Sequence, residues 1–192
     1  MSTMKNLRVL SMATMVAFMG SMASCKKNDP PKPDEQELIT TLKIQVNEEF
    51  SSSVQTYEYK VENGFGGSGG TIKIDTLKLK PNTKYSAVLT VLNEKANPVE
   101  DITTEIIEES NDHLFLFSSN PSAGAGSVSA TNGNKDKNGA PLNQTFTLNT
   151  NATGNGKFQV VLLHEPSNKN AIIISAAGGE TDLDATFPVV LQ

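Results

Sequence analysis

The chain is poor in the residues that build several common kinds of site. Of its 192 residues, one is cysteine, none is tryptophan and three are tyrosine. A single cysteine excludes an internal disulfide, and few flat aromatic side chains are available to stack on bases or sugar rings. The one arginine is Arg8. The rest of the chain therefore has no guanidinium group to hold a phosphate or a carboxylate through two hydrogen bonds.

A membrane-spanning run is also missing from the N-terminal region. The uncharged segment from Val9 to Met22 has 14 residues, too few for a helix to cross ~30 Å of hydrocarbon. It follows Lys5 and Arg8 and precedes the small residues 23–24. A basic start, a short apolar segment and small residues in this order are typical of a secretory signal. All six methionines lie in this region, so we assign them to the signal and not to a core.

The only cysteine closes this signal. The segment Met22-Ala23-Ser24-Cys25 resembles a bacterial lipobox, in which the thiol is acylated with chains such as palmitate and becomes the new N-terminus. Lys26 is not a residue that retains lipoproteins in the inner membrane. We therefore expect cleavage before Cys25, lipidation of Cys25 and location in the bacterial outer membrane, on either face. The alternative is an ordinary signal with an incidental cysteine.

Composition then divides the chain into three parts. Residues 1–24 are the expected signal, and residues 25–36 form a lipidated tether whose only apolar side chains beyond Cys25 are prolines. Residues 37–192 are long enough to bury one core without disulfides. After cleavage the chain would carry 14 lysines and 21 acidic residues. An acidic chain without arginine is unsuited to nucleic acid, so we expect no nucleic-acid partner.

Apolar residues alternate with polar ones through most of the third part, which predicts β-strands. The alternation is clear on the even positions 42–46 and on the odd positions 183–191, where Pro188 suits an edge strand or a bulge. Four Asn-Gly pairs predict hairpin turns. The glycine-rich stretch 63–70 is interpreted as a long hairpin tip and not as a phosphate cradle, because residues 71–80 have the pattern of a strand.

One helix is predicted, near residues 98–111. Asn97 is placed to cap it, Pro98 suits its first position and Glu100 completes a capping box. Its apolar stripe would consist of Val99, Ile102 and Ile106.

A local motif indicates how the strands are arranged. The segment from Leu79 to Tyr85 reads Leu-Lys-Pro-Asn-Thr-Lys-Tyr and resembles the tyrosine corner of fibronectin type III domains. The resemblance implies that Tyr85 is buried, with its hydroxyl group bonded to the backbone of the preceding turn. We therefore expect an all-β fold, an antiparallel immunoglobulin-like Greek-key β-sandwich with one short helix.

Four further segments, 37–43, 92–94, 100–103 and 179–187, resemble a family of small Bacteroidota envelope lipoproteins. Members are often labelled as periplasmic-binding folds of type 1, which would imply a parallel sheet with several helices. One helix and about nine strands favour the antiparallel sandwich instead. Some members are encoded beside TonB-dependent uptake receptors of the outer membrane. The resemblance implies a non-catalytic binding or accessory module that acts with such a receptor.

The two histidines supply the alternative function. His113 and His164, with Glu180 or Asp182, are candidate ligands of a metal ion or of haem in a scavenging lipoprotein. The competing interpretation makes His113 the cap of a helix end and His164 a hydrogen-bonded residue at the rim of the sandwich. No local ligand spacing supports a metal, so we expect no cofactor.

Three weaker signals complete the set of candidate sites. Residues 100–112 hold six acidic groups and no basic one, and Glu105, Glu108 and Glu109 are candidates for a partner surface or for a solvated face. Thr76, in Asp-Thr-Leu, fits an O-glycosylation pattern. Residues 134–139 space oxygen ligands as a calcium loop does or form a plain Asn-Gly turn. No catalytic set is apparent, and we expect no enzyme.

Overall fold

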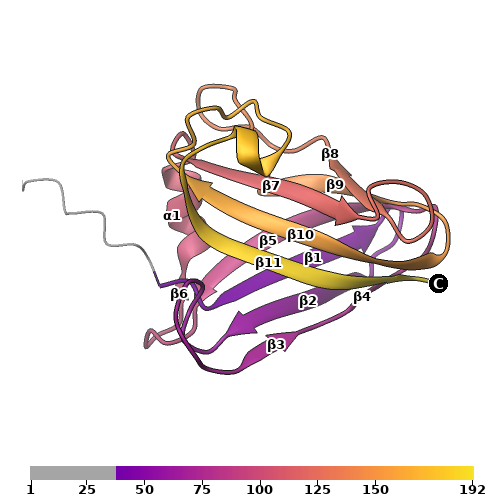
Figure 1. The fold of residues 1–192 in the computed structure, drawn as a ribbon, viewed down its shortest axis with the longest axis horizontal. Coiled ribbons are helices and arrows are strands. Elements are labelled where there is room, and N and C mark those ends of the chain that lie inside the picture. The colour runs from indigo at the N-terminus through magenta and orange to yellow at the C-terminus, as the bar shows by residue number, and fades with distance from the viewer. Residues whose placement is uncertain (1–37) are drawn as a thin grey trace, which may run out of the picture. The chain divides into compact units, whose positions relative to one another are not determined.

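Two β-sheets face each other across a hydrophobic core in the computed structural model, which describes residues 38–192 (Figure 1). Cys25, the expected signal and the expected tether lie outside the described residues. One sheet has the order β3-β2-β1-β5-β9-β8, with β6 paired to β5, and the other has the order β4-β11-β10-β7. Every pair is antiparallel except β4 with β11. The prediction of a mostly β fold with one short helix is confirmed.

The chain crosses from one sheet to the other several times and builds neither sheet in one continuous run. The first sheet contains β1 (Thr41–Glu48), β2 (Val54–Val61), β3 (Ile72–Ile74), β5 (Lys84–Asn93), β6 (Glu100–Asp101), β8 (Val128–Thr131) and β9 (Thr145–Thr150). The second contains β4 (Leu77–Leu79), β7 (His113–Asn120), β10 (Gly154–His164) and β11 (Glu180–Leu191). The helical elements are α1 (Ile102–Glu108) and the 3-10 turn η1 (Ile174–Ala176).

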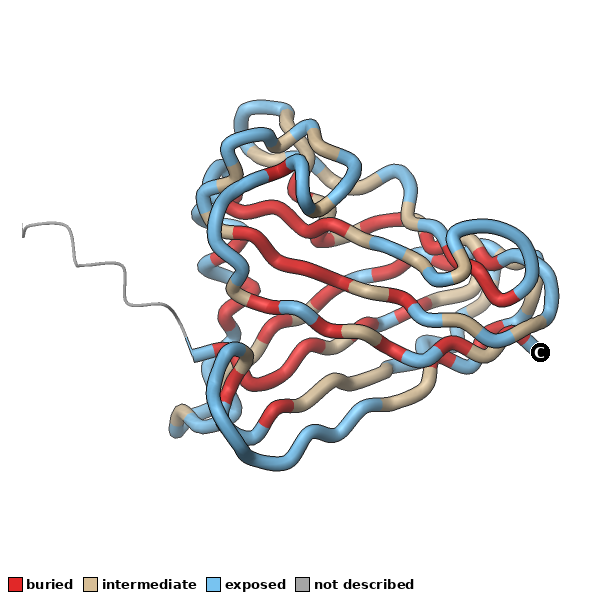
Figure 2. The backbone as a smooth tube through the Cα atoms, in the orientation of Figure 1, coloured by how far each residue is buried: buried red, intermediate tan, exposed pale blue. Residues whose placement is uncertain are grey.

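The alternation in the sequence matches the observed burial. The even positions 42–46 of β1 and the odd positions 183–191 of β11 are buried, while intervening residues are exposed or half-buried (Figure 2). Pro188 lies one residue before β4 joins β11, where β11 has β10 as its only neighbour. At this point β11 is locally an edge strand, where a residue without an N–H group is tolerated, as expected. The glycine-rich stretch joins β2 and β3 as a hairpin, also as expected.

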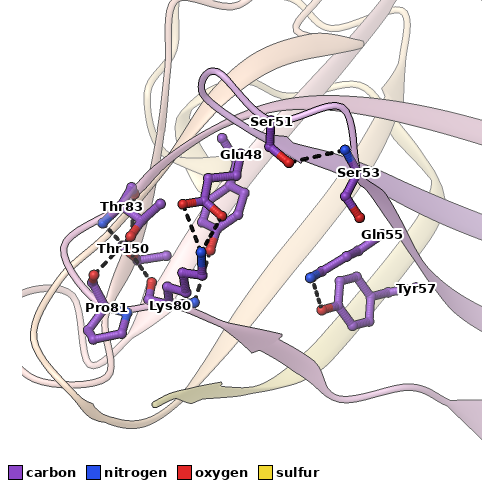
Figure 3. A network of polar contacts seen from close by, with 10 residues as sticks. Glu48, Ser51, Ser53, Gln55, Tyr57, Lys80, Pro81, Thr83 and Thr150 are labelled. Atoms are coloured by element: carbon purple, nitrogen blue, oxygen red, sulfur yellow. Dashed lines mark hydrogen bonds and ion pairs between the residues drawn. The ribbon is translucent and has the colours of Figure 1, made fainter.

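The tyrosine corner is present. Tyr85 is buried, and its hydroxyl group accepts a hydrogen bond from the backbone N–H of Lys80 at 2.9 Å. The same turn is held by Thr150, whose hydroxyl group donates to the carbonyl of Lys80 and accepts from the N–H of Thr83. The side chain of Lys80 pairs with Glu48 across the turn (Figure 3). The turn between β4 and β5 is thus tied to β1 and to the end of β9.

The helix is shorter than predicted, and its start was wrong. Residues 100–101 pair with β5 as strand β6, so Asp101 and not Asn97 caps the helix, by accepting from the N–H of Thr103. Val99 is exposed, and the third buried residue beside Ile102 and Ile106 is Thr103. The Thr103 hydroxyl group bonds to both backbone groups of Val91. A polar residue therefore fills a core position because β5 supplies its partners.

Two further local features differ from the sequence pattern. Asn155-Gly156 lies inside β10 and not in a turn. A Cβ atom at Gly156 would lie 2.3 Å from the carbonyl oxygen of Gly126, so glycine is needed there for a close backbone approach. On the outer face of the second sheet, a second apolar cluster lies against the segment 171–177. Its buried members are Leu114, Leu116, Val161, Leu163 and Ala177.

Candidate functional site: a neutral groove and a histidine pair

The two histidines meet at one end of the second sheet. His113 on β7 is paired in register with His164 on β10, and their rings are stacked with centroids 4.9 Å apart and planes at 11°. The Nδ1 atom of His113 lies 3.1 Å from the carbonyl oxygen of Glu109, the C-terminal cap residue of α1. Because a carbonyl oxygen only accepts, Nδ1 carries the proton. His113 therefore caps the helix end.

This stacked arrangement is unsuited to a shared metal ion. The lone pair of an imidazole nitrogen lies in the ring plane, so two nearly parallel rings direct their lone pairs side by side and not toward one point at ~2.0–2.1 Å. Axial ligation of haem would instead require the rings to approach iron from opposite sides. Between residues 38 and 192, no group of three or more histidine, cysteine, aspartate or glutamate side chains is placed to hold a metal ion.

The two candidate carboxylates lie in different settings. Glu180 is exposed and stands opposite His164 in the β10–β11 register, so His113, His164 and Glu180 form one row across three strands. Asp182 is the extra residue of a bulge, because Leu183 and Thr181 face consecutive residues of β10. The fold thus brings the histidines and Glu180 to one sheet end and sets Asp182 into an irregularity beside them.

Two lysines contact the backbone at the end of helix α1, beside the acidic side chains. Glu105, Glu108 and Glu109 are all exposed on or just after α1. The ammonium group of Lys137 donates to the carbonyl of Glu108, and that of Lys169 donates to the carbonyl of Ser110. Cations at the C-terminal end of a helix offset its dipole. The lysines therefore stabilise the end of α1 through its backbone carbonyl groups, and the acidic side chains are left to face solvent or a partner.

Asp136 is occupied by internal contacts. Its Oδ1 atom accepts from the N–H groups of Asn138 and Ala140, and its Oδ2 atom lies 2.6 Å from Nζ of Lys169. Burial raises the pKa of Asp136, but the hydrogen bonds from Lys169 and the backbone outweigh it and hold the pKa below its usual value. Asn134 likewise accepts from the N–H of Thr145. These contacts build the turn, and they use the oxygens that a calcium ion would need.

Thr76 lies at the crossing from β3 to β4, where the chain passes from one sheet to the other. It is half-buried, and the preceding Asp75 accepts from the N–H of Glu58 through its carboxylate. The expected O-glycosylation position thus lies in a short connection that is held to β2 by a hydrogen bond.

A groove of about 440 Å³ lies between the edge strands β7 and β8, which run along the upper side of the view in Figure 1. Its walls are residues 116–119 of β7 and residues 128–133 of β8 and the following turn, and residues 170–172 border it. Phe146 and Phe158 line its interior. Phe117, half-buried in the wall, packs against both of them at centroid distances of 4.4 and 5.6 Å.

Among residues 38–192, no charged side chain lines this groove. Two long uncharged stretches, 114–134 and 138–156, are brought together there, and the lining consists of hydroxyl, amide and apolar groups. The sequence interpretation missed this site because each stretch has the composition of ordinary loops and strands. The absence of charge over both stretches was the available signal. That signal indicates a groove only when β7 and β8 are known to be edge strands of two different sheets.

Comparison of the chain with protein-family models, with curated proteins and with solved structures gives no match. Among residues 38–192, no helix is long and apolar enough to cross a membrane.

Proposed function

We propose that this protein is a non-catalytic binding and accessory module that is held at the bacterial outer membrane by lipid on Cys25. The groove between β7 and β8 is the observation that carries the binding role. Its volume falls within the range of ~300–1,000 Å³ found for ligand sites. Hydroxyl and amide groups bind a ligand by hydrogen bonds, and phenyl rings bury an apolar group. None of these side chains exchanges a proton near neutral pH, which favours binding over acid–base catalysis.

The partner in this proposal is a TonB-dependent uptake receptor. The resemblance to Bacteroidota lipoproteins encoded beside such receptors supports this choice. A second surface is available on α1, where Glu105, Glu108 and Glu109 are exposed together. The groove and this acidic surface differ in charge, so they would serve different contacts.

The proposal includes an immunoglobulin-like Greek-key arrangement for the sandwich. The buried Tyr85 and its bond to Lys80 support it, because that corner is a feature of such folds. The parallel pairing of β4 with β11 and the seven strands of the first sheet are features specific to this chain.

The alternative, a scavenger of metal or haem, requires the two imidazole rings to leave their stacked arrangement. His113 would also have to keep or replace its bond to Glu109. We therefore favour the binding module.

The proposal is tested by purifying the tagged full-length protein from its own outer membranes after cross-linking in intact cells. We expect a β-barrel uptake receptor to be recovered in comparable molar amount. The matched control is Cys25→Ala, which lacks the anchor and should recover little receptor. Receptor recovery no greater than from an untagged strain would contradict the proposed partner.

A further inference from the structure

We propose that the free edge of β7 binds an extended, uncharged segment of a partner protein, which adds as a strand beside Phe117 and Ser119. This inference rests on the proposed binding role and specifies the ligand class of the groove. Addition of a strand to a sheet edge is a common mode of peptide recognition, in which main-chain hydrogen bonds supply affinity and side-chain pockets supply specificity.

The hydrogen bonds of Phe115 show which residues of β7 face outward. Its N–H donates to the carbonyl of Leu142, and its carbonyl accepts from the side chain of Asn143. Phe115 therefore directs its backbone groups away from β10. In an antiparallel pair this direction alternates along the strand, so Phe117 and Ser119 face the same way. Residues 142–143 occupy the position beside Phe115 and then turn away toward β9.

Phe117 and Ser119 are engaged through their side chains: the ring of Phe117 packs on Phe146, and the hydroxyl group of Ser119 donates to the carbonyl of Pro121 and accepts from the N–H of Val128. Among residues 38–192, no loop residue hydrogen-bonds to the backbone of either one, and both are half-buried at the groove. Natural edge strands are commonly protected by lysine or other charged residues. Residue 73 of β3 and residue 78 of β4 are lysines of this kind, whereas β7 has no charge after His113.

The lining of the groove defines the chemistry of the incoming segment. A charged side chain entering it would lose water without meeting a counter-charge, which is costly. The ring of Phe117, packed on Phe146 and Phe158, offers an apolar contact for one side chain. Ser129 and Thr131, exposed on β8, offer hydroxyl groups. The favoured segment therefore alternates an apolar residue with serine, threonine or asparagine. A neutral saccharide would leave the outward backbone of β7 less completely bonded.

The test begins with selection of displayed random ten-residue linear peptides on the full-length protein in detergent. The peptides enriched should lack charged residues. The best is then synthesised and methylated on alternate backbone nitrogens in each of the two registers. A strand directs its N–H groups alternately to the two sides, so one register should weaken binding by about tenfold or more while the other is tolerated. Equal effects in both registers would overturn strand addition.

Two lysine variants test the location. Ser129→Lys and, independently, Ser118→Lys should each weaken peptide binding by about tenfold or more, because they place a charge at the groove. Ser53→Lys, the same change in the exposed turn before β2, should leave binding unchanged. Thermal unfolding checks that each variant is folded. Binding that survives in both groove variants would refute the location.

Other occupants appear as distinct outcomes. If neutral oligosaccharides compete with the peptide, the groove binds a saccharide and the peptide inference is overturned. If sedimentation shows that the protein self-associates and that peptide binding is lost when it does, the occupant is a second copy, which also overturns the inference. Failure to enrich any peptide over the bare matrix would also overturn it. Because receptor recovery from membranes is measured separately, such a failure leaves the proposed function standing, whereas loss of receptor recovery contradicts that function itself.

Discussion

At the scale of single residues, the hydroxyl group of Tyr85 fixes the turn between β4 and β5. Tyr85→Phe keeps the buried ring and removes the acceptor of the Lys80 N–H. We expect the free energy of unfolding to fall by about 1 kcal/mol, the usual net value of one such bond. The matched control is Tyr59→Phe, because Tyr59 packs through its ring on Phe65 and Phe187. Urea unfolding of both variants measures the difference; equal midpoints would contradict this role.

The second residue-scale prediction concerns the pair between Asp136 and Lys169, whose side chains are 1% and 12% exposed. Asp136→Asn keeps an acceptor for the turn but leaves Lys169 without its counter-charge. We expect a loss of roughly 3 kcal/mol near neutral pH. Asp136→Asn combined with Lys169→Met should recover part of that loss, because no charge is then left unpaired. Chemical unfolding at neutral pH tests this, and a double variant less stable than the single one would contradict it.

The pKa of Asp136 sets the pH dependence of that loss. Its pKa is lower in the folded chain than in the unfolded chain, whose value is ~3.9. The stabilisation is therefore complete above that unfolded value and disappears as pH falls through the folded pKa. The stability difference between wild type and Asp136→Asn should be constant above about pH 5 and should shrink below about pH 4. A difference that grows on acidification would contradict the assignment.

Individual residues were predictable where one local rule decided their environment. Tyr85 follows from its motif, and the buried residues of β1 and β11 follow from alternation. Thr103 and the cap at Asp101 did not follow, because Thr103 bonds to Val91 and residues 100–101 pair with β5, which is a separate element. The stacking of His113 on His164 depends on the β7–β10 register, which no local pattern specifies.

At the scale of elements, α1 presents the acidic surface that we assign to a partner. The helix ends at Glu108, so Glu105 and Glu109 form a repulsive pair near its C-terminus, while Glu108 and Asp112 are not a helical pair. Changing Glu105, Glu108 and Glu109 to Gln should stabilise the domain by a few tenths of a kcal/mol. It should also weaken receptor association, most strongly at low salt, since exposed charges are screened over ~10 Å at 0.1 M.

Pull-down of the receptor at two ionic strengths, with wild type and the triple variant, measures this effect. A matched control changes the exposed Glu49 of the β1–β2 turn to Gln. If wild type and the triple variant recover the same amount of receptor at both salt concentrations, the acidic segment is a solvated face and not a partner surface.

Element prediction failed where tertiary pairing overrode a local signal. Asn155-Gly156 has the sequence of a hairpin turn but lies within β10, because glycine there permits contact with the backbone near Gly126. By alternation, Val161 and Leu163 lie on the face of β10 opposite the core residues Phe158, Val160 and Leu162. They are nevertheless buried, because the segment 171–177 lies against that face. Residues 171–174 are apolar, but the alternation within β10 does not show that a segment outside the strands will cover its outer face.

At the scale of the whole molecule, charge is distributed unevenly between the two open sides of the sandwich. The side with β3 and β4 carries lysines on its edge strands, whereas the side with β7 and β8 borders an uncharged groove. Sheet edges are where proteins associate unless charge prevents it. The uncharged side is therefore the one available for a partner.

The proposed lipid anchor supplies the last prediction. Cys25→Ala removes the thiol that we propose receives the lipid, and the uncharged segment before it is too short to span a bilayer. We expect the variant to be released in soluble form or to remain unprocessed, and wild type to partition into the detergent phase with the outer membranes. Lys27→Ala leaves the thiol in place and should behave as wild type. Detergent phase separation, with mass spectrometry of the N-terminal peptide, measures both outcomes. Complete membrane partition of a processed Cys25→Ala chain would show that the protein is held by something other than lipid, because no acyl chain can then be attached at that position.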